Sequence, residues 1–351
     1  MTPLAATAAM AAGQATTTRA PAAAATSPAG GTYAFGGPLS SRFPSQVIID
    51  VTELCNLACT HCPHPAFKRS VHYAGRQLDP ALCAKAIDEV AEQDPGTVLQ
   101  VRFTSEGEPL LHPGIYSMLA DAVARSGTFV SLTTNGVLLT PDRIDRLLAT
   151  GVHMVDVSID AFTPETYASI RVRGDLRVTA ANTERLIARA RDVGGATRVI
   201  VSYIEQPENL EETADFERYW RGAGAADVAI RRLHSAAGAV IPVADVLRRR
   251  AGGVDRRPCV YPWERIVLTP RGTLAFCPAD WTGGSTLADY RDTSIEDLWR
   301  SERYAALRAA HLVGDYRAHA FCGQCPDWQE TRWPHEGRSY ASLVGRLKEG
   351  A

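Results

Sequence analysis

Short apolar runs rich in β-branched residues alternate along the chain with longer segments whose apolar residues recur at helical spacing. The apolar runs predict six strands, at 47–51, 98–103, 128–133, 153–159, 198–204 and 228–233. The segments between them predict helices at 81–93, 115–125, 141–149, 183–193 and 210–220. Strands and helices in this order form a parallel sheet covered by helices, and right-handed crossovers curl such a sheet into a barrel or part of one. The sequence therefore predicts an α/β fold built on six parallel strands.

A different pattern follows the sixth strand. The segment 266–276 carries a Pro-Arg-Gly turn between apolar residues and predicts a β-hairpin. The segment 294–308 has apolar residues on one face and predicts a helix. We therefore expect a barrel domain over residues 46–240, a smaller domain over 241–335, and a C-terminal tail over 336–351.

The first 45 residues differ in composition from the rest of the chain. Up to about residue 40 they are mostly Ala, Thr, Pro, Gly and Ser, with Arg19 as the single basic residue. This composition cannot bury a core and predicts a disordered tail. A signal peptide is the alternative, but the basic start is missing and the apolar segment is weak.

Charge and hydropathy exclude two classes of partner. The 37 basic and 39 acidic residues give a net charge of −2, without the basic excess that nucleic-acid binding requires. No stretch reaches the roughly 18 apolar residues of a membrane span. We expect neither a nucleic acid nor a membrane as partner.

Seven of the eight cysteines fall into two groups, and Cys83 stands alone on a predicted helix, where it reads as a small buried apolar residue. The first group has the spacing C-x3-C-x2-C and consists of Cys55, Cys59 and Cys62. The second ends in C-x2-C and consists of Cys259, Cys277, Cys322 and Cys325. These are spacings of metal ligands rather than of disulfides, and thiols that bind metal must stay reduced, which predicts a cytoplasmic protein.

The first group follows the first predicted strand, where a β/α barrel presents its functional loops. Three thiolates leave one coordination position open, whereas structural zinc normally takes four ligands. The motif resembles that of the radical S-adenosylmethionine (SAM) superfamily, whose three cysteines hold a [4Fe-4S] cluster that binds SAM at its fourth iron. The residue before the third cysteine is aromatic in that family. Here it is His61, whose ring can also stack on adenine. A zinc site is the alternative.

Other residues match segments that contact SAM in the family. Gly107, Glu108 and Pro109 resemble the end of its Gly-Gly-Glu-Pro segment, although Glu106 replaces the first glycine. Glycine permits close backbone approach, and a carboxylate suits the SAM ammonium group. The resemblance further implies SAM contacts at the ends of the third and fourth strands, from Ser131, Thr133, Asn135 and Ser158. Arg171 resembles an arginine that binds the SAM carboxylate; a surface salt bridge is the alternative.

The second cysteine group resembles the C-terminal SPASM/twitch extension of radical SAM enzymes. Thr331 and His335 occupy positions where the full SPASM pattern has further cysteines. The four cysteines present are enough to ligate one auxiliary [4Fe-4S] cluster, as in the twitch form. A zinc site is again the alternative. The resemblance thus implies a partial (β/α)6 radical SAM barrel with a small C-terminal iron–sulfur domain, two [4Fe-4S] clusters and SAM.

The spacing of the distal cysteines is similar to that of radical SAM dehydrogenases acting on aminocyclitols. This similarity implies oxidation of a secondary hydroxyl of an aminocyclitol or sugar in antibiotic-type metabolism, with the auxiliary cluster as electron acceptor and a flavodoxin- or ferredoxin-type electron donor. A group near the barrel mouth would accept the hydroxyl proton or orient the oxygen. The candidates are Arg231, Arg232, His234 and Asp280.

Three other functions stay open. A peptide-modifying radical SAM enzyme often carries a folded N-terminal recognition domain, whereas this chain begins with a low-complexity segment. A sugar epimerase would need a hydrogen donor, for which Cys83 is the one spare cysteine. A zinc-binding interaction protein without catalysis is the alternative from a different class.

Overall fold

The computed structural model describes residues 25–26, 32–104, 106–194, 197–252, 254–337 and 344–347. Residues 1–34 and 35–351 form two compact units. In the first unit, β1 (Ala25–Thr26) pairs antiparallel with β2 (Thr32–Tyr33). All other described helices and strands belong to the second unit.

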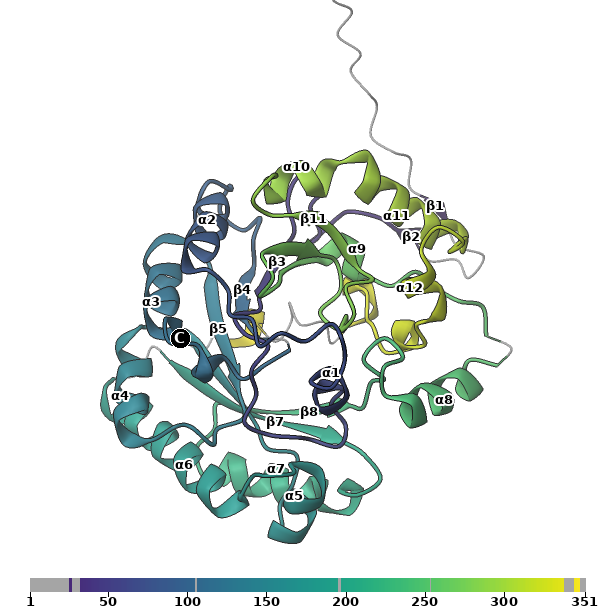
Figure 1. Cartoon of the computed structure of the whole chain (residues 1–351). Helices are drawn as coiled ribbons and strands as arrows, with labels where there is room; N and C mark the ends of the chain where they lie inside the picture. Colours follow the sequence, from purple (N-terminus) through teal and green to yellow (C-terminus); the bar gives the residue numbers. More distant parts are fainter. Residues whose placement is uncertain are drawn as a thin grey trace, which may run out of the picture. The chain divides into compact units, whose positions relative to one another are not determined.

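The second unit is built on one sheet, whose described strands have the order β11-β10-β9-β3-β4-β5-β6-β7-β8. Strands β3 to β8 are parallel throughout and curve around the centre of the fold (Figure 1). They are β3 (Gln46–Ile49), β4 (Gln100–Phe103), β5 (Phe129–Thr134), β6 (Met154–Ser158), β7 (Arg198–Glu205) and β8 (Asp227–Arg232). The predicted α/β fold with six parallel strands is confirmed.

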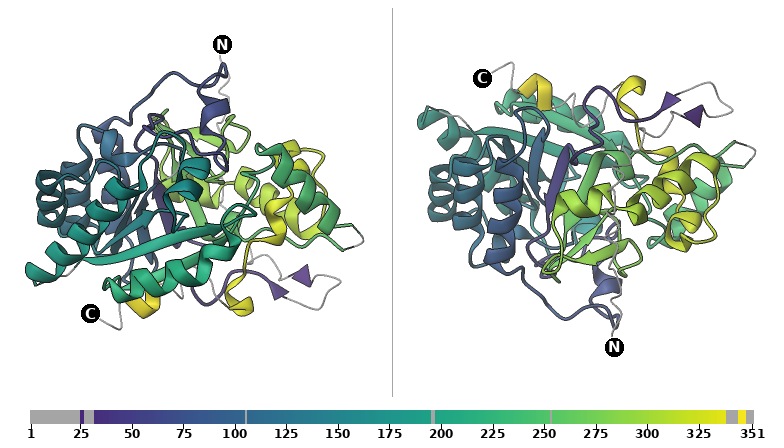
Figure 2. Two further views of the ribbon diagram at one scale, coloured as in Figure 1. Left: turned by 90° about the horizontal axis from the view of Figure 1, so that it is seen from below. Right: turned by 90° about the horizontal axis from the view of Figure 1, so that it is seen from above.

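Apart from the short α1 (His64–Phe67) in the loop after β3, the helices between these strands lie on the outside of the curved sheet (Figures 1 and 2). They are α2 (Pro80–Ala91), α3 (Ile115–Arg125), α4 (Pro141–Ala149), α5 (Pro164–Ile170), α6 (Leu176–Asp192) and α7 (Thr213–Gly222). The start of α6 was predicted at residue 183, which is wrong. The Asp175 side chain accepts a hydrogen bond from the Arg177 backbone N–H and begins the helix earlier.

Alternate side chains along each strand point either outward to the helices or inward to the interior of the barrel. Outward side chains such as Val47, Val101 and Val155 pack with the helices in the main hydrophobic core. The inward face carries buried polar side chains such as Ser131 and Asp156 together with apolar ones such as Met154. A polar interior fits a barrel that positions a ligand rather than one filled only with apolar side chains.

The C-terminal part continues the same sheet. Strand β9 (Arg265–Leu268) pairs parallel with β3, and β10 (Thr273–Ala275) and β11 (Thr286–Asp289) add antiparallel strands beyond it. The predicted hairpin over 266–276 is confirmed. The helices of this part are α8 (Ile241–Arg250), α9 (Tyr261–Glu264), α10 (Ile295–Arg300), α11 (Glu302–Val313) and α12 (Ala320–Gln324).

One helix predicted over 294–308 is two helices in the structure. Ser301 has extended backbone angles and ends α10, and its hydroxyl accepts a hydrogen bond from the Tyr304 N–H to cap α11. Serine is a good N-cap because its side chain satisfies a free N–H of the first turn. Apolar periodicity did not reveal the break because both helices present apolar residues to the core.

The ordered unit extends beyond the boundaries expected from composition. Phe43 is fully buried, so the packed chain begins before residue 46, within the segment predicted as a tail. Val344 and Leu347, in the predicted C-terminal tail, pack with buried side chains of β5, β6 and β7. Of the two predicted tails, the structure describes Ala25–Thr26 and the stretches 32–45, 336–337 and 344–347; their other residues lie outside the described part of the chain. No described helix is both long and apolar enough to span a bilayer.

Candidate radical SAM and auxiliary cluster sites

The loop after β3 carries the first cysteine group. Its backbone is held by hydrogen bonds from the Ala58 N–H to the Val172 carbonyl (3.0 Å) and from the Thr60 N–H to the Ile170 carbonyl (2.9 Å). Burial raises the pKa of the Cys55 thiol to about 11 and that of Cys62 to about 12, and each of these pKa values is raised further by the neighbouring cysteines. The three thiols are therefore gathered in one place, where a bound cation such as iron would favour the thiolate form.

Gly107 and Glu108 join the loop after β4 to the cysteine loop. A Cβ atom at Gly107 would lie 2.2 Å from the Thr52 carbonyl oxygen and 2.5 Å from that of Leu54, so the two backbones meet where only glycine fits. The Glu108 N–H donates to the Leu54 carbonyl at 2.8 Å. Pro109 follows as the first residue of a short 3-10 helix, Pro109–Leu111.

The Glu108 carboxylate is already well occupied by protein donors. It accepts hydrogen bonds from the Leu110 N–H (3.1 Å), the Thr134 hydroxyl (2.7 Å) and the Asn135 N–H (2.8 Å). These bonds fasten the end of β5 to the loop after β4. In the structure the Glu108 carboxylate holds the end of β5 against the loop after β4. The sequence predicted that this carboxylate contacts the SAM ammonium group.

The other expected SAM contacts lie on β5, directly after it and on β6. Asn135 donates from Nδ2 to Asn56 Oδ1 at 2.8 Å, beside the first cysteine. Ser131 is buried and accepts a hydrogen bond from Gln100 Nε2 at 2.7 Å, and Thr133 is half-buried two residues further on the same face. Ser158 accepts a hydrogen bond from Arg171.

Arg171 is buried next to the cysteine loop, so the surface salt bridge considered as its alternative role is wrong. Its guanidinium pairs with Asp160 and lies 3.8 Å from the Cys59 sulfur. His61 Nε2 is 3.6 Å from Asp160 Oδ2. Burial lowers the pKa of His61 to about 4, so the ring is neutral near pH 7.

Two buried nitrogen atoms of this group, His61 Nδ1 and Arg171 Nε, have no hydrogen-bond partner among the described residues. Polar atoms that are buried without a partner are uncommon and mark places where a ligand can complete the bonding. Their position beside Cys59 fits a polar ligand such as SAM at the first cysteine group.

The second cysteine group gathers from distant parts of the chain. Cys259 precedes α9, Cys277 follows β10, and Cys322 and Cys325 lie in and directly after α12. Burial raises the pKa of Cys277, and the other three thiols raise it further, which places all four near one another. All eight cysteines are free thiols.

The cysteines do not form a compact site for a single ion. No group of three or more His, Cys, Asp and Glu side chains in the described part of the chain is arranged to hold one metal ion. An iron–sulfur cluster requires a wider spacing of the thiolates than a single ion does, because each thiolate binds a separate iron.

One cavity of about 1110 Å³ connects the two cysteine groups. Its lining includes Cys62 of the first group and all four cysteines of the second. Charged side chains from the barrel also line it, among them Arg102 and Arg231. A molecule in this cavity can therefore lie between the two candidate cluster sites.

Three of the four predicted base candidates line this cavity. Arg231 pairs with the buried Asp156, and Arg232 is exposed and lies 3.8 Å from Glu330. His234 is also exposed, and its Nδ1 accepts a hydrogen bond from the Ala236 N–H at 3.1 Å, so the neutral ring carries its proton on Nε2. The lone pair of the neutral ring is thus engaged by the backbone in this structure.

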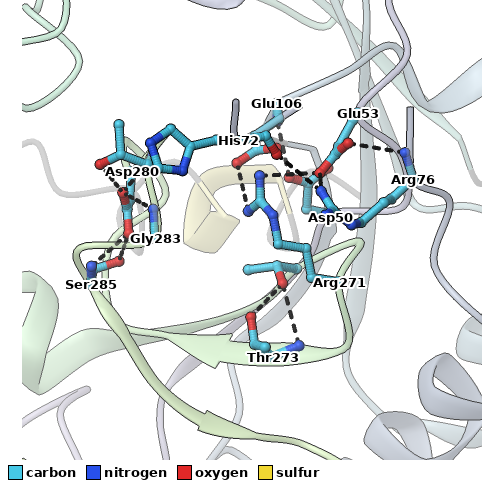
Figure 3. A network of polar contacts seen from close by, with 12 residues as sticks. Asp50, Glu53, His72, Arg76, Glu106, Arg271, Thr273, Asp280, Gly283 and Ser285 are labelled. Atoms are coloured by element: carbon cyan, nitrogen blue, oxygen red, sulfur yellow. Dashed lines mark hydrogen bonds and ion pairs between the residues drawn. The ribbon is translucent and has the colours of Figure 1, made fainter. Parts of the chain in front are cut away.

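Asp280, the fourth predicted base candidate, is not among the residues that line the cavity, and its carboxylate is bonded to the loop that follows it. Its Oδ1 accepts hydrogen bonds from the backbone N–H groups of Thr282, Gly283 and Gly284. Its Oδ2 accepts from both the N–H and the hydroxyl of Ser285. Both carboxylate oxygens thus hold the loop after Cys277 (Figure 3).

The structure also reveals an acidic group that the sequence did not identify as a unit. Arg271, in the turn between β9 and β10, pairs with Glu53 at 3.1 Å and with Glu106 at 3.5 Å (Figure 3). The Glu106 N–H donates to Asp50 Oδ2 at 3.1 Å. Burial raises the pKa of Glu106 to about 7 and that of Asp50 well above its usual range. The signal in the sequence was Glu106 itself, which stands where the family has glycine.

Two domain families match the chain in the regions of these sites. Residues 49–216 match the Radical SAM superfamily, and residues 259–326 match SPASM, an iron–sulfur cluster-binding domain. The chain contains a radical SAM domain followed by a SPASM domain. The first implies a [4Fe-4S] cluster with SAM and the second implies additional iron–sulfur binding, which the gathered cysteines and the unpartnered atoms beside Cys59 fit. Of the two kinds of metal site predicted for the cysteines, iron–sulfur clusters are favoured over zinc.

Curated relatives of the radical SAM–SPASM chain include peptide and nucleotide cyclases. It is 30% identical over 252 residues to the PqqA peptide cyclase of Ruegeria pomeroyi, covering 70% of this chain and 61% of the relative. It is 38% identical over 149 residues to the GTP 3',8-cyclase of Chlorobaculum tepidum, covering 42% of each. The chain thus spans less than two thirds of the length of these relatives. The PqqA peptide cyclase of Xanthomonas campestris pv. campestris is 27% identical, with 81% of both chains covered.

Solved structures share the fold of the radical SAM–SPASM chain at low sequence identity. BtrN in complex with AdoMet and 2-DOIA has a TM-score of 0.56 at 16% identity, covering 80% of this chain and 92% of that one. Streptococcus suis SuiB bound to the precursor peptide SuiA has a TM-score of 0.61 at 15% identity, covering 87% and 73%. These likenesses support the fold alone.

Proposed function

We propose that this chain is a radical SAM dehydrogenase that oxidises a secondary hydroxyl of an aminocyclitol or sugar to a ketone. The observation that carries the proposal is a cavity, lined by described residues, that reaches both cysteine groups. When bound, a [4Fe-4S] cluster with SAM supplies a 5′-deoxyadenosyl radical, and an auxiliary cluster supplies an acceptor for one electron. Oxidation of an alcohol requires the loss of one hydrogen atom from carbon, one proton from oxygen and one electron, so a substrate between two such sites is suitably placed.

The protein's own part in this reaction is to orient the substrate and exclude water. Arg231 is the candidate that best suits a hydroxyl, because it lines the cavity and its guanidinium is held by the buried Asp156. A guanidinium is a poor base but can stabilise an oxygen that is losing its proton. Asp156 Oδ1 is buried and has no hydrogen-bond partner among the described residues, so this carboxylate has a position open for a proton or a hydroxyl.

A peptide-modifying activity is the second candidate. The observation that favours it is the similarity to PqqA peptide cyclases, which covers 81% of both chains in one case. The fold is compatible with it, since the solved SuiB structure holds a precursor peptide. For both candidates we propose a flavodoxin- or ferredoxin-type protein as electron donor.

The Cys83 thiol is not placed to support the sugar epimerase alternative. It is buried in the core on α2, where burial raises its pKa to about 12, and it does not line the cavity. A hydrogen donor for an epimerase must reach the substrate radical, so another residue would have to serve.

The test compares substrates and cluster variants under anaerobic conditions. Reconstituted, reduced protein is incubated with SAM and either a panel of aminocyclitols and sugars or the PqqA peptide, and 5′-deoxyadenosine and product masses are measured. A cyclitol product lighter by two hydrogens supports the dehydrogenase, whereas a modified peptide with unchanged cyclitols supports the second candidate. Cys59→Ala should abolish SAM cleavage. Replacement of the four distal cysteines by Ala should retain SAM cleavage and lose ketone formation.

A further inference from the structure

His311 of α11 is a buried histidine beside the second cysteine group. The residue is 2% exposed and lines the cavity together with the four distal cysteines. The rings of Trp263 and Tyr316 meet it edge to face, at centroid distances of 6.1 and 5.0 Å. The imidazole is therefore fixed in one orientation by its neighbours.

The hydrogen bonds of His311 determine its tautomer. The Cys259 N–H donates to Nδ1 at 3.3 Å, and the Tyr316 hydroxyl lies 3.5 Å from the same atom. A peptide N–H can only donate, so Nδ1 must be an unprotonated acceptor. The neutral ring consequently carries its proton on Nε2.

This Nε2–H group has no acceptor among the described residues, although it is buried. Buried donors are almost always paired, and an unpaired one requires an explanation. The cavity that His311 lines is the place where the distal cysteines converge. An acceptor in that cavity would be a sulfur of the cluster that these cysteines hold.

Two features argue for hydrogen bonding rather than iron ligation by His311. The four distal cysteines already suffice for the four irons of a cube. Arg256 lies close by as a fixed cation, because it donates to the carbonyl oxygens of Gly323 (3.0 Å) and Cys322 (2.6 Å) and covers the Tyr316 ring at 4.1 Å. The surroundings thus supply one positive charge and one N–H donor to a group that gains negative charge on reduction.

We propose that His311 donates a hydrogen bond from Nε2 to a sulfur of the auxiliary cluster and thereby raises the reduction potential of that cluster. Hydrogen bonds to cluster sulfur stabilise the more negative reduced state. A higher potential makes the cluster a better acceptor for the electron that leaves the substrate. The inference rests on the auxiliary cluster of the proposed function and is independent of the substrate's identity. His311 is a positioning and tuning residue, which need not touch substrate.

The experiment uses a matched pair of variants in the full chain. Cys55, Cys59 and Cys62 are replaced by Ala in every sample, so that only the auxiliary cluster is observed. His311→Asn retains an acceptor near the Nδ1 position for the Cys259 N–H but lacks the distal donor. His311→Gln places an N–H donor near the Nε2 position instead. Iron and sulfide are quantified, and the midpoint potential is measured by a redox titration followed by EPR.

We expect a lower midpoint potential for His311→Asn than for the parent, and a smaller decrease for His311→Gln. Equal potentials in all three samples at full iron content would overturn the proposal. A second measurement decides the case in which His311→Asn fails to hold iron. The parent and His311→Gln are labelled with 15N-histidine and compared by pulsed EPR of the reduced cluster.

A weak 15N coupling in the parent that is missing in His311→Gln supports the hydrogen bond. A coupling as strong as that of a direct iron ligand, or no difference between the two samples, contradicts it. Neither measurement needs substrate. A chain that shows the potential shift but oxidises no cyclitol would therefore refute the dehydrogenase proposal and leave this inference standing.

Discussion

The guanidinium of Arg271 lies 3.1 Å from Oε1 of Glu53, which is fully buried two residues before Cys55. This ion pair connects the turn of the C-terminal hairpin to the loop that carries Cys55, and its second arm reaches Glu106 after β4. The SPASM part of the chain therefore supports the geometry of the radical SAM site directly. The connection has consequences for stability that can be measured.

Arg271→Ala should destabilise the protein by roughly 3 kcal/mol, because it leaves two buried carboxylates with less compensating charge. Arg76 still serves Glu53, at 2.9 Å, which limits the loss. Arg189→Ala is the matched control, since its pair with Asp145 is exposed on both sides and should contribute little. Thermal unfolding of the cluster-loaded proteins measures both. Equal midpoints for the two variants would contradict a structural role for Arg271.

Glu106 should make stability depend on pH. Burial raises its pKa to about 7 from an ordinary value of 4.5, with Asp280 and Glu53 adding to the effect and Arg271 opposing it. Its contribution is therefore fully present below about pH 4.5 and is lost as the pH rises through 7. Asp50, whose pKa burial also raises, faces it and acts in the same direction.

Glu106→Gln removes this titration, so the variant should gain stability relative to the parent between about pH 5 and pH 8. The expected gain is on the order of 1–3 kcal/mol, since each pKa unit corresponds to about 1.4 kcal/mol. Denaturant unfolding at both pH values measures the difference. If the gap between variant and parent is the same at the two pH values, Glu106 is ionised throughout the range and the assignment fails.

Gly107→Ala should damage the first cluster site selectively. The added Cβ would lie within 2.5 Å of two backbone oxygens that precede Cys55, so the cysteine loop must move. We expect loss of most SAM cleavage and of the iron of the first cluster, with the auxiliary iron retained. Gly222→Ala, at the end of α7 with open space around its Cα, is the control and should behave like the parent. Normal SAM cleavage by Gly107→Ala would show that the loop tolerates the shift.

Arg171→Ala should weaken SAM binding. It removes the cation that neutralises the buried Asp160 and a donor that lies 3.8 Å from the Cys59 sulfur. Arg171→Lys keeps the charge but cannot bond Asp160 and Ser158 from one guanidinium group, so an intermediate loss is expected. Equilibrium binding of SAM to the reconstituted proteins gives the dissociation constants. Unchanged affinity in both variants would confine Arg171 to supporting the loop.

Much of the fold and both cysteine groups were predictable from the sequence. The strands could be located because each contains β-branched and apolar residues, continuously in Val47-Ile48-Ile49 and at alternate positions in strands such as β6, as expected for buried parallel strands. The cysteines could be grouped because their chemistry demands convergence, even for Cys277 and Cys322, which lie 45 positions apart in the sequence.

Contacts of ordinary residues over long sequence distances were not predictable. The sequence around Arg271 predicts a turn, but it gives no sign that the side chain pairs with Glu53 and Glu106. The sequence predicts Asp280 as a candidate base, and only the structure shows that six hydrogen bonds from the following loop occupy its oxygens. His311 belongs to no sequence motif. Its ring is oriented by a hydrogen bond from a backbone N–H in another segment, which the sequence does not reveal.

The pairing of β9 with β3 ties the two halves of the chain at the level of the backbone. Cutting the chain after residue 240 would strip β3 of one neighbour and leave its N–H and C=O groups open to any passing strand. The radical SAM part alone would then tend to aggregate, and the cysteine loop after β3 would be less well held. We therefore expect that the radical SAM and SPASM parts can be moved into another protein only together.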